Sequence, residues 1–471
     1  MAVFGQSTPI SGIVNNYTSV SAFGDGCPNS LTVSDASDFS VGDRIFLIQM
    51  KGADIDENNT LFFGSITNIN EAGNYEFGTI STIEGNAISL VHNLMNDYDV
   101  DGIVQLVRVP QYQNATVTDA LTCQAWQGSI GGVLVMEISN ELTLEAPITT
   151  NGMGFRGGSV SSVPDLSIQC SSTDYFFPNN PSLGGEKGEG ITIISPERMT
   201  GRGALANGGG GGNDHNSGGG GGANATGGGI GGNEWSGCAS FPTGGMGGKP
   251  LSFPSKLFLG GGGGGGHQNN DVGTPGTNGG GMIIIRANTL TSNNFPISAN
   301  GNDLFSVAGN DGAGGGGAGG SILLDVENYT GILTLTANGG QGGDVNNNFS
   351  QDGQCHGNGG GGSGGLIGVT NIVFPAGIIP LIQGGAAGQQ VNMESDCAGT
   401  SYGANPGEDG ILQTNFILNE SSDVANDLVV DLGPDQVLCQ GQTIVLDPAL
   451  NLVGTWQDGS ELETYTVSQS G

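Results

Sequence analysis

Glycine constrains this chain more than any other residue type, because 92 of its 471 residues are glycine and 73 of these lie between residues 151 and 410. Ordering one glycine costs roughly 1–2 kcal/mol of backbone entropy, and no side chain is buried in return. The glycine-rich region therefore either forms mobile loops or forms a lattice in which backbones bond to one another.

An ordered solution exists because glycine can adopt the extended threefold helix related to polyproline II, which rises about 3.1 Å per residue. Such helices have no internal hydrogen bonds, so their N–H and C=O groups must bond neighbouring helices. Only residues without a Cβ allow that close approach. The separate runs favour an ordered polyglycine II bundle over mobile loops; they cover residues 208–212, 218–222, 227–229, 260–266 and 314–317.

Short strand-forming cassettes separate the glycine runs. A glycine start, an apolar strand, a second strand and an Asn-Gly or glycine-rich turn recur in three copies, beginning at Gly131, Gly281 and Gly320. Shorter relatives begin at Gly190, Gly365 and Gly410. Each copy has too few apolar side chains for a core of its own, so the copies must stack. The pattern predicts a β-solenoid-like array with polyglycine II-type insertions.

Composition divides this all-β chain into three predicted domains. Residues 1–125 carry short β-branched runs bounded by turn residues, which is typical of an antiparallel sandwich or barrel. Residues 126–420 form the predicted glycine-rich β-repeat domain. Residues 427–471 show the alternating pattern of an immunoglobulin-like sandwich, but such a domain needs about 100 residues. We therefore expect this last domain to be incomplete and the natural protein to be longer.

The charge balance excludes several classes of partner. Lys and Arg total 10 against 44 Asp and Glu, a formal net charge of −34, and no Lys or Arg follows Arg286. Nucleic acids and anionic membrane surfaces both require clustered basic residues. The chain also lacks an apolar run of about 18 residues that could span a bilayer. We predict neither nucleic-acid binding nor membrane insertion.

The seven cysteines are widely spaced and form no Cys-x-x-Cys pair, which does not fit a zinc ribbon. In an acidic chain rich in Asn, Ser, Thr and Gly, they indicate disulfides formed in an oxidising, extracellular compartment. One cysteine is left over, and the pairing stays open. At Cys355-His356 a disulfide is favoured over a metal site, because no second pair lies nearby in the sequence.

Catalytic motifs carry little weight in this sequence. Gly361–Gly365 matches the Gly-x-Ser-x-Gly nucleophile elbow, but a glycine tract produces that match by chance. A polysaccharide lyase or hydrolase needs carboxylates, often with a base, converging on one solenoid wall. The acids in or beside clear cassette strands are Glu137, Asp325 and Glu327. Arg286 is the base, and we expect that these residues do not recur at matching cassette positions. We predict no catalytic residues and no enzymatic activity.

Further polar features are interpreted as structural. Asp97–Gly102 resembles the opening of a calcium loop, but its twelfth position is Arg108 instead of a bidentate Glu, so a turn is favoured. Arg156 is expected to satisfy turn carbonyls, and Trp126 and Trp235 to be buried. We therefore predict no metal-binding residue, no cofactor-binding residue and no cofactor, with calcium as the open alternative.

Motifs at both ends of the chain resemble one group of proteins. Asp431–Gly433, Leu438–Gln442, Trp456–Gly459 and Tyr465–Val467 are similar to the Ig-like repeats of Bacteroidota surface proteins. That group includes gliding-motility adhesins and other giant adhesins exported by the type IX secretion system. The N-terminal part resembles their glycine-rich head regions. This likeness rests on Val41–Asp43, Ile48–Ala53, Val107–Tyr112, Trp126–Gly128 and Gly152–Gly158.

The resemblance implies a non-enzymatic protein of the cell surface or extracellular space, in which a glycine-rich head or shaft precedes Ig-like repeats. Packing between glycine tracts of different copies favours a homo-oligomer, and the expected ligand is a glycan or a cell-surface molecule. Two alternatives stay open. One is the subunit of an extracellular filament or hook without its own ligand site, and the other is a β-solenoid polysaccharide lyase or hydrolase.

Overall fold

The computed structural model describes residues 7–24, 27–161, 170, 173–238, 242–251, 253, 255–269, 272–347 and 354–419, with a few more between 443 and 467. The chain divides into two compact units, Met1–Ser421 and Ser422–Gly471. Nearly all the regular elements are β-strands, which confirms the all-β prediction. Within the described part of the chain, three 3-10 helices span Val100–Gly102, Pro181–Leu183 and Pro196–Arg198, and no helix there is long and apolar enough to cross a membrane.

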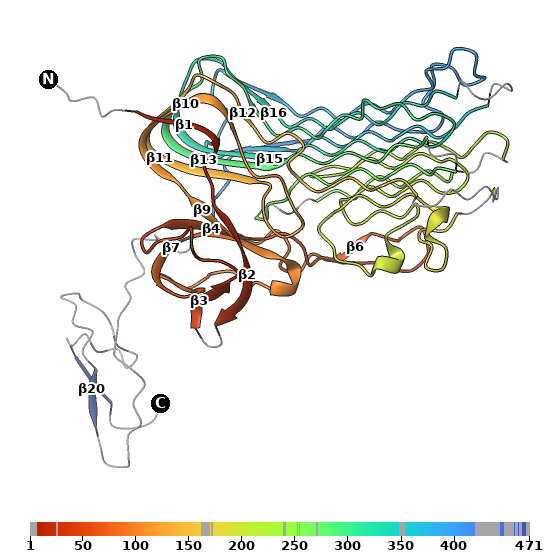
Figure 1. The fold of residues 1–471 in the computed structure, drawn as a ribbon. Helices are drawn as coiled ribbons and strands as arrows, with labels where there is room; N and C mark the ends of the chain where they lie inside the picture. The colour runs from red at the N-terminus through yellow and green to blue at the C-terminus, as the bar shows by residue number, and fades with distance from the viewer. Residues whose placement is uncertain are drawn as a thin grey trace. The chain divides into compact units, whose positions relative to one another are not determined.

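Six of the strands between Tyr17 and Val109 form a closed antiparallel barrel with the order β2-β3-β8-β7-β4-β9 (Figure 1), so the barrel alternative of the prediction is correct. The barrel strands are β2 (Tyr17–Gly24), β3 (Cys27–Val33), β4 (Arg44–Gln49), β7 (Tyr75–Glu84), β8 (Ala87–Leu90) and β9 (Val104–Val109). A separate pair consists of β5 (Asp54–Ile55) and β6 (Ile66–Asn68). Strand β4 is buried on both faces: Ile45 and Leu47 belong to the barrel core, whereas Phe46 and Ile48 pack into a second core shared with the neighbouring sheet.

A parallel sheet follows the barrel and stacks the cassettes as rungs, which confirms the β-solenoid-like prediction (Figure 1). A rung combines a long strand and a short one, except that β10 spans both positions and β19 stands alone. The sheet contains β1 (Thr8–Ile13), β10 (Gln111–Thr122), β11 (Val133–Leu144), β12 (Ile148–Thr149), β13 (Met282–Thr291), β14 (Ile297–Ser298), β15 (Ser321–Thr330), β16 (Leu333–Thr336), β17 (Leu366–Val369), β18 (Ile378–Leu381) and β19 (Ile411–Gln413). Only Pro110 separates β9 from β10, so the chain passes from the barrel directly into the sheet, to which β1 at the start of the chain also belongs through its pairing with β10.

Alternation along each long strand builds the solenoid core. In β11, Leu134, Met136 and Ile138 point into a core that runs through successive rungs. Val133 and Val135 point to the opposite side and join the core that the sheet shares with the barrel. Because successive side chains of a strand face opposite ways, a run of consecutive apolar residues indicates a wall buried on both faces.

The predicted cassette at Gly190 is wrong. Ile191 lies in no strand; its N–H bonds the side chain of Asn207 at 2.9 Å. Its carbonyl oxygen accepts the N–H groups of Gly52 and Ala53. The backbone groups that a rung would use for pairing are therefore engaged by other parts of the chain.

The glycine-rich segments form an ordered bundle of threads that lie side by side (Figure 1). Segment 260–266 lies in its interior and donates its N–H groups in a repeat of three. Residues 260, 263 and 266 bond segment 274–280, residues 261 and 264 bond 220–223, and residues 262 and 265 bond 186–189. Its carbonyl oxygens accept N–H groups from three further segments: 155–158, 209–212 and 315–318.

Six neighbours with a threefold period are the geometry of polyglycine II, which confirms the ordered alternative. A Cβ built on Gly264 would lie 2.0 Å from the carbonyl oxygen of Gly210, so only glycine fits there. Each N–H···O bond contributes about 1 kcal/mol net and avoids a larger cost for a buried unpaired group. Mutual bonding therefore offsets the entropy that ordered glycines lose.

Asparagine links the rungs where each short strand passes into glycine. The Oδ1 atoms of Asn151, Asn300 and Asn338 each accept the backbone N–H at the same position of the next rung, at 2.7, 2.7 and 2.8 Å. This ladder explains why the cassettes end in Asn-Gly. The carboxamide bonds rung to rung, and the next residue enters the glycine bundle.

Two disulfides, Cys170–Cys238 and Cys355–Cys397, lie among the described residues, and Cys123 is free and buried. In the second unit, β20 (Ile444–Leu446) pairs antiparallel with β21 (Tyr465–Val467). Most of the rest of the predicted Ig-like domain, Cys439 included, lies outside the described residues.

Candidate functional site

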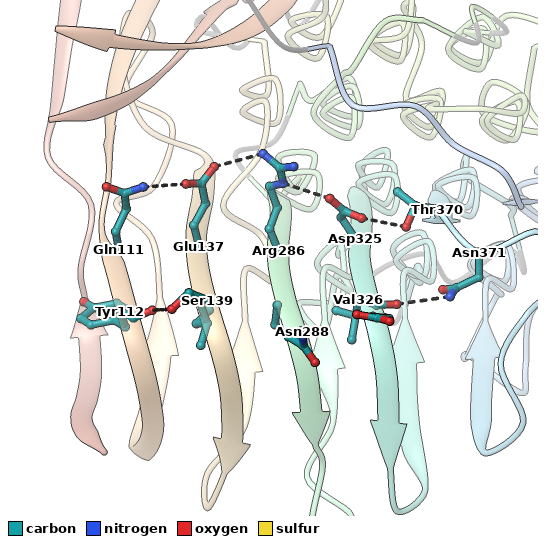
Figure 2. Close-up of a pocket in the computed structure, with 13 residues that line it drawn as sticks. Gln111, Tyr112, Glu137, Ser139, Arg286, Asn288, Asp325, Val326, Thr370 and Asn371 are labelled. Carbon is teal, nitrogen blue, oxygen red and sulfur yellow. Dashed lines mark hydrogen bonds and ion pairs between the residues drawn. The ribbon is translucent and has the colours of Figure 1, made fainter. Parts of the chain in front are cut away.

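A groove of about 850 Å³ lies on the outer face of the parallel sheet, across β10, β11, β13 and β15 (Figure 2). Its volume is within the range of ligand sites, about 300–1,000 Å³. The strands are parallel, so side chains at one level form a row that crosses them with a spacing of about 4.8 Å. Two such rows line the groove.

The first row is a continuous chain of polar contacts (Figure 2). Arg286 is central: its Nη1 donates to Glu137 Oε1 at 3.2 Å and its Nε donates to Asp325 Oδ2 at 2.9 Å. Gln111 Nε2 donates to Glu137 Oε2 at 2.9 Å, and Thr370 Oγ1 donates to Asp325 Oδ1 at 2.9 Å. Both carboxylates are therefore held by donors on two sides, and the row is rigid.

The barrel supports this row from behind. Arg44 of β4, only 7 % exposed, donates from Nε to Glu137 Oε1 at 3.2 Å. The guanidinium groups of Arg44 and Arg286 lie 5.3 and 5.7 Å from the centre of the Phe77 ring. Phe77 belongs to the core between barrel and sheet. Packing of the barrel therefore fixes the orientation of the groove floor.

The second row lies two residues further along the strands and faces the same way. It consists of Ser139, Asn288 and Glu327, which are exposed. Asn371, in the connection after β17, continues it, and its Nδ2 donates to the carbonyl oxygen of Val326 at 3.2 Å. This row is polar and mostly uncharged.

A local irregularity shapes the hollow. Between Ile138 and Glu141, β11 has one residue more than either neighbouring strand, so its register shifts against both β10 and β13. Such a β-bulge bends the strand and redirects its side chains. The groove lies at this bulge, so we attribute its concave form to it.

The charged residues of this wall are aligned, contrary to the expectation from the sequence. Glu137, Arg286 and Asp325 pair in register on three successive long strands, so the prediction that these residues do not recur at matching positions is wrong. At this aligned position β11 has an acid, β13 a base and β15 an acid. The pattern was missed because we looked for the same residue type in each cassette, not for complementary charges. Gln111 and Thr370 were missed altogether, because Gln111 was assigned to the first domain and Thr370 follows a short strand.

A second hollow, of about 530 Å³, contains charged groups that are already paired. Glu189 accepts from Lys51 Nζ at 2.6 Å and from Arg156 Nε at 3.0 Å. Burial alone would raise the pKa of Glu189, but Lys51 and the hydrogen bonds outweigh it and lower the pKa to about 2. Burial lowers the pKa of Lys51 despite this partner, so desolvation of the ammonium reduces the net gain. We interpret this cluster as a clamp between the barrel and the glycine bundle.

Lys187 forms another structural contact in the same region. Its Nζ donates to the carbonyl oxygens of Tyr175, Gly201 and Gly203 at 2.5, 2.8 and 2.8 Å, and it lies 4.7 Å from the centre of the Phe63 ring. Complete burial lowers the pKa of Lys187 well below its ordinary value. All three donor positions of the ammonium are used, so this lysine supports the fold and takes no ligand.

The other polar candidates have structural roles. Arg156 bonds a carboxylate and not the turn carbonyls that were expected. Trp126 is 3 % exposed, as predicted, and Trp235 is partly buried with its indole N–H donating to Gln354. In the Asp97–Gly102 segment, Asp99 caps a 3-10 helix by accepting from the N–H of Asp101.

Ser363, the central residue of the nucleophile-elbow match, is buried in the glycine bundle and donates to the carbonyl oxygen of Gly364. Cys355 forms a disulfide with Cys397, as the sequence favoured. Across the described ranges, no three His, Cys, Asp or Glu side chains are grouped in a way that could hold a metal ion.

Comparisons with known proteins add little. No protein-family model matches the chain, and no curated protein matches it. Among solved structures, it is similar to the tailspike of Acinetobacter baumannii bacteriophage AP22 in complex with A. baumannii capsular saccharide, with 9 % identity and a TM-score of 0.17. The match covers 87 % of this chain and 61 % of that one.

Proposed function

We propose that this chain is the rigid head of an extracellular adhesive protein, and that the groove across β10, β11, β13 and β15 is its saccharide-binding surface. The observation that carries this proposal is the first row, in which polar side chains from successive rungs are locked by mutual hydrogen bonds. A preorganised polar surface binds hydroxyl-rich ligands without a further ordering cost.

The geometry favours binding over turnover. A glycosidase requires one carboxyl group that delivers a proton and a second carboxylate that attacks the sugar or activates water. In this groove, Glu137 and Asp325 both accept hydrogen bonds from Arg286. That sharing suits recognition, because it fixes acceptors in place, and it opposes the separate roles that hydrolysis needs.

The edges of the sheet favour a head over a self-stacking filament subunit. Of the described strands, β1 pairs only with β10, β18 only with β16, and β19 only with β17. Pro9 in β1 and Pro380 in β18 remove backbone donors, and β19 has only three residues. Prolines and short edge strands oppose pairing with another sheet. Homo-oligomer formation stays a prediction, to be tested by sedimentation velocity.

The disulfides and the sequence resemblance both bear on where the protein is located. The disulfides fit an oxidising, extracellular compartment. Attachment to a cell surface, type IX export and a role in gliding are further parts of the proposal, and they rest on the sequence resemblance alone. Detection of the protein on intact cells with an antibody, before and after protease shaving, tests the surface location.

Saccharide binding is tested on a glycan array and by calorimetry with two matched variants. Asn288→Trp places a large side chain in the groove, whereas Thr334→Trp adds the same side chain on β16, outside it. We expect the wild type and Thr334→Trp to bind the same glycans, and Asn288→Trp to lose them. The proposal fails if the wild type binds no glycan, or if Asn288→Trp binds as well as Thr334→Trp.

A further inference from the structure

We infer that the groove selects saccharides that carry no carboxylate or sulfate group, and that Glu327 is the residue that sets this selection. This inference rests on the proposed function and names the ligand class of that same groove.

The charge of the groove lining is the first argument. Glu137, Asp325 and Glu327 face the groove against a single cation, Arg286. Arg286 donates to both carboxylates of the first row, and Arg44, which also pairs with Glu137, is buried. The cations beside the groove are therefore engaged by its own acids, and an acidic sugar would add a negative charge to a site that already has an excess of it.

The later part of the sequence cannot supply a compensating cation either. No Lys or Arg follows Arg286, so β15, β17, β19 and their connections cannot supply one to this side of the groove. The chain as a whole has a formal net charge of −34, which also repels polyanions during their approach. A neutral glycan meets neither penalty.

Glu327 is the acid of the groove that is left to face a ligand. It lies two residues beyond Asp325 on β15, on the same exposed face. In contrast to Glu137 and Asp325, it is exposed, and among the described residues no cation forms an ion pair with it. Asn288 lies at the same level of the neighbouring strand, since the flanking residues of β13 and β15 pair in register. A sugar that contacts this second row therefore comes close to the Glu327 carboxylate.

The experiment compares neutral with acidic oligosaccharides on four forms of the protein. The probes are hexamers of cellulose, laminarin, mannan and chitin, and hexamers of alginate and polygalacturonate. The proteins are the wild type, Glu327→Gln, Glu327→Lys, and Glu84→Gln as a control. Glu84 is an exposed acid of the barrel strand β7, so its substitution changes the net charge equally without touching the groove.

We expect the wild type to bind at least one neutral hexamer and to bind the acidic hexamers more weakly at low salt. Glu327→Gln should improve acidic binding about three- to tenfold, as one nearby charge predicts, and Glu327→Lys should improve it further. Neutral binding should change less than acidic binding does in each Glu327 variant, and added salt should reduce the differences in acidic binding.

The inference is overturned if the wild type binds acidic hexamers as tightly as neutral ones. It is also overturned if Glu84→Gln changes acidic binding as much as Glu327→Gln does, because repulsion would then come from the whole chain and not from this residue. Absence of binding to every hexamer, neutral or acidic, is a different result, since it contradicts saccharide binding itself.

Discussion

Replacement of Gly264 by alanine is the most direct test of the polyglycine lattice. A Cβ at this position would lie 2.0 Å from the carbonyl oxygen of Gly210 and 2.4 Å from its carbon. Both are backbone atoms, which cannot move aside as the end of a flexible side chain can. The two segments must therefore separate by about 1 Å before the contact becomes even barely tolerable.

The cost follows from that separation. Overpacking costs about 1–3 kcal/mol. Movement of the segment also stretches the bonds from Gly264 N–H to Gly220 and from Gly315 N–H to Gly264, both 2.8 Å long, and each buried group left unpaired costs about 1–3 kcal/mol. Alanine raises the free energy of unfolding by only about 0.4–1 kcal/mol through restricting the unfolded chain. We expect the free energy of unfolding to fall by about 3 kcal/mol or more.

A matched control lies in the same bundle. At Gly227, the nearest atom to an added Cβ is a carboxylate oxygen of Glu408 at 3.3 Å, which can move. Urea unfolding followed by circular dichroism, with native-state amide exchange, should show a large loss for Gly264→Ala and a change within about 0.5 kcal/mol for Gly227→Ala. If Gly264→Ala unfolds at the wild-type urea concentration with its bundle amides still protected, the lattice reasoning is refuted.

Three further predictions concern pH, redox state and chemical ageing. The pKa of Glu189 is about 2 in the fold against an ordinary 4.5. The stability that ionised Glu189 contributes is therefore complete above pH 4.5 and disappears as the pH falls towards 2. Glu189→Gln should flatten the dependence of the unfolding free energy on pH by at most about 3 kcal/mol, reduced by the cost of desolvating Lys51. Reduction of Cys355–Cys397, which closes a loop of 42 residues, should lower the free energy of unfolding by about 4 kcal/mol in the chain-entropy limit. A variant with both cysteines replaced by serine that has the same free energy of unfolding as the oxidised wild type would contradict this. Asn300-Gly301 should resist deamidation in the native protein but not in urea, because the Gly301 N–H and the Asn300 carboxamide are both bonded to Asn338. Equal deamidation rates in the two states, measured by peptide mapping with mass spectrometry, would rule this out.

Much of the fold was predictable because its signals are local. A strand cassette followed by Asn-Gly marks one rung, and the copies at Gly131, Gly281 and Gly320 each correspond to a pair of strands. The cassette at Gly190 shows the limit of this approach. Its apolar residues look like a strand, but its backbone groups bond Asn207 and the loop after β4 instead. Local pattern cannot reveal a competing partner that is distant in sequence.

The candidate groove was less predictable than the fold. Its acids and its base were noted from the sequence, yet their alignment was missed, because Glu137 and Arg286 are 149 positions apart. Loops of very different length separate the rungs, so sequence spacing does not give the register. The bulge of β11 at Ile138–Glu141, to which we attribute the hollow, depends in the same way on pairing between strands.

The composition of the glycine runs already dictates how they can be ordered. Without a Cβ they cannot build a side-chain core, so their backbones must bond to one another. Which segments become neighbours, and hence which side chains meet on the wall, depends on the folded molecule, because parallel register is set by the packing of whole rungs against the barrel and the bundle. Physical proximity of Glu137, Arg286 and Asp325 is a property of that packing and of no single stretch of chain.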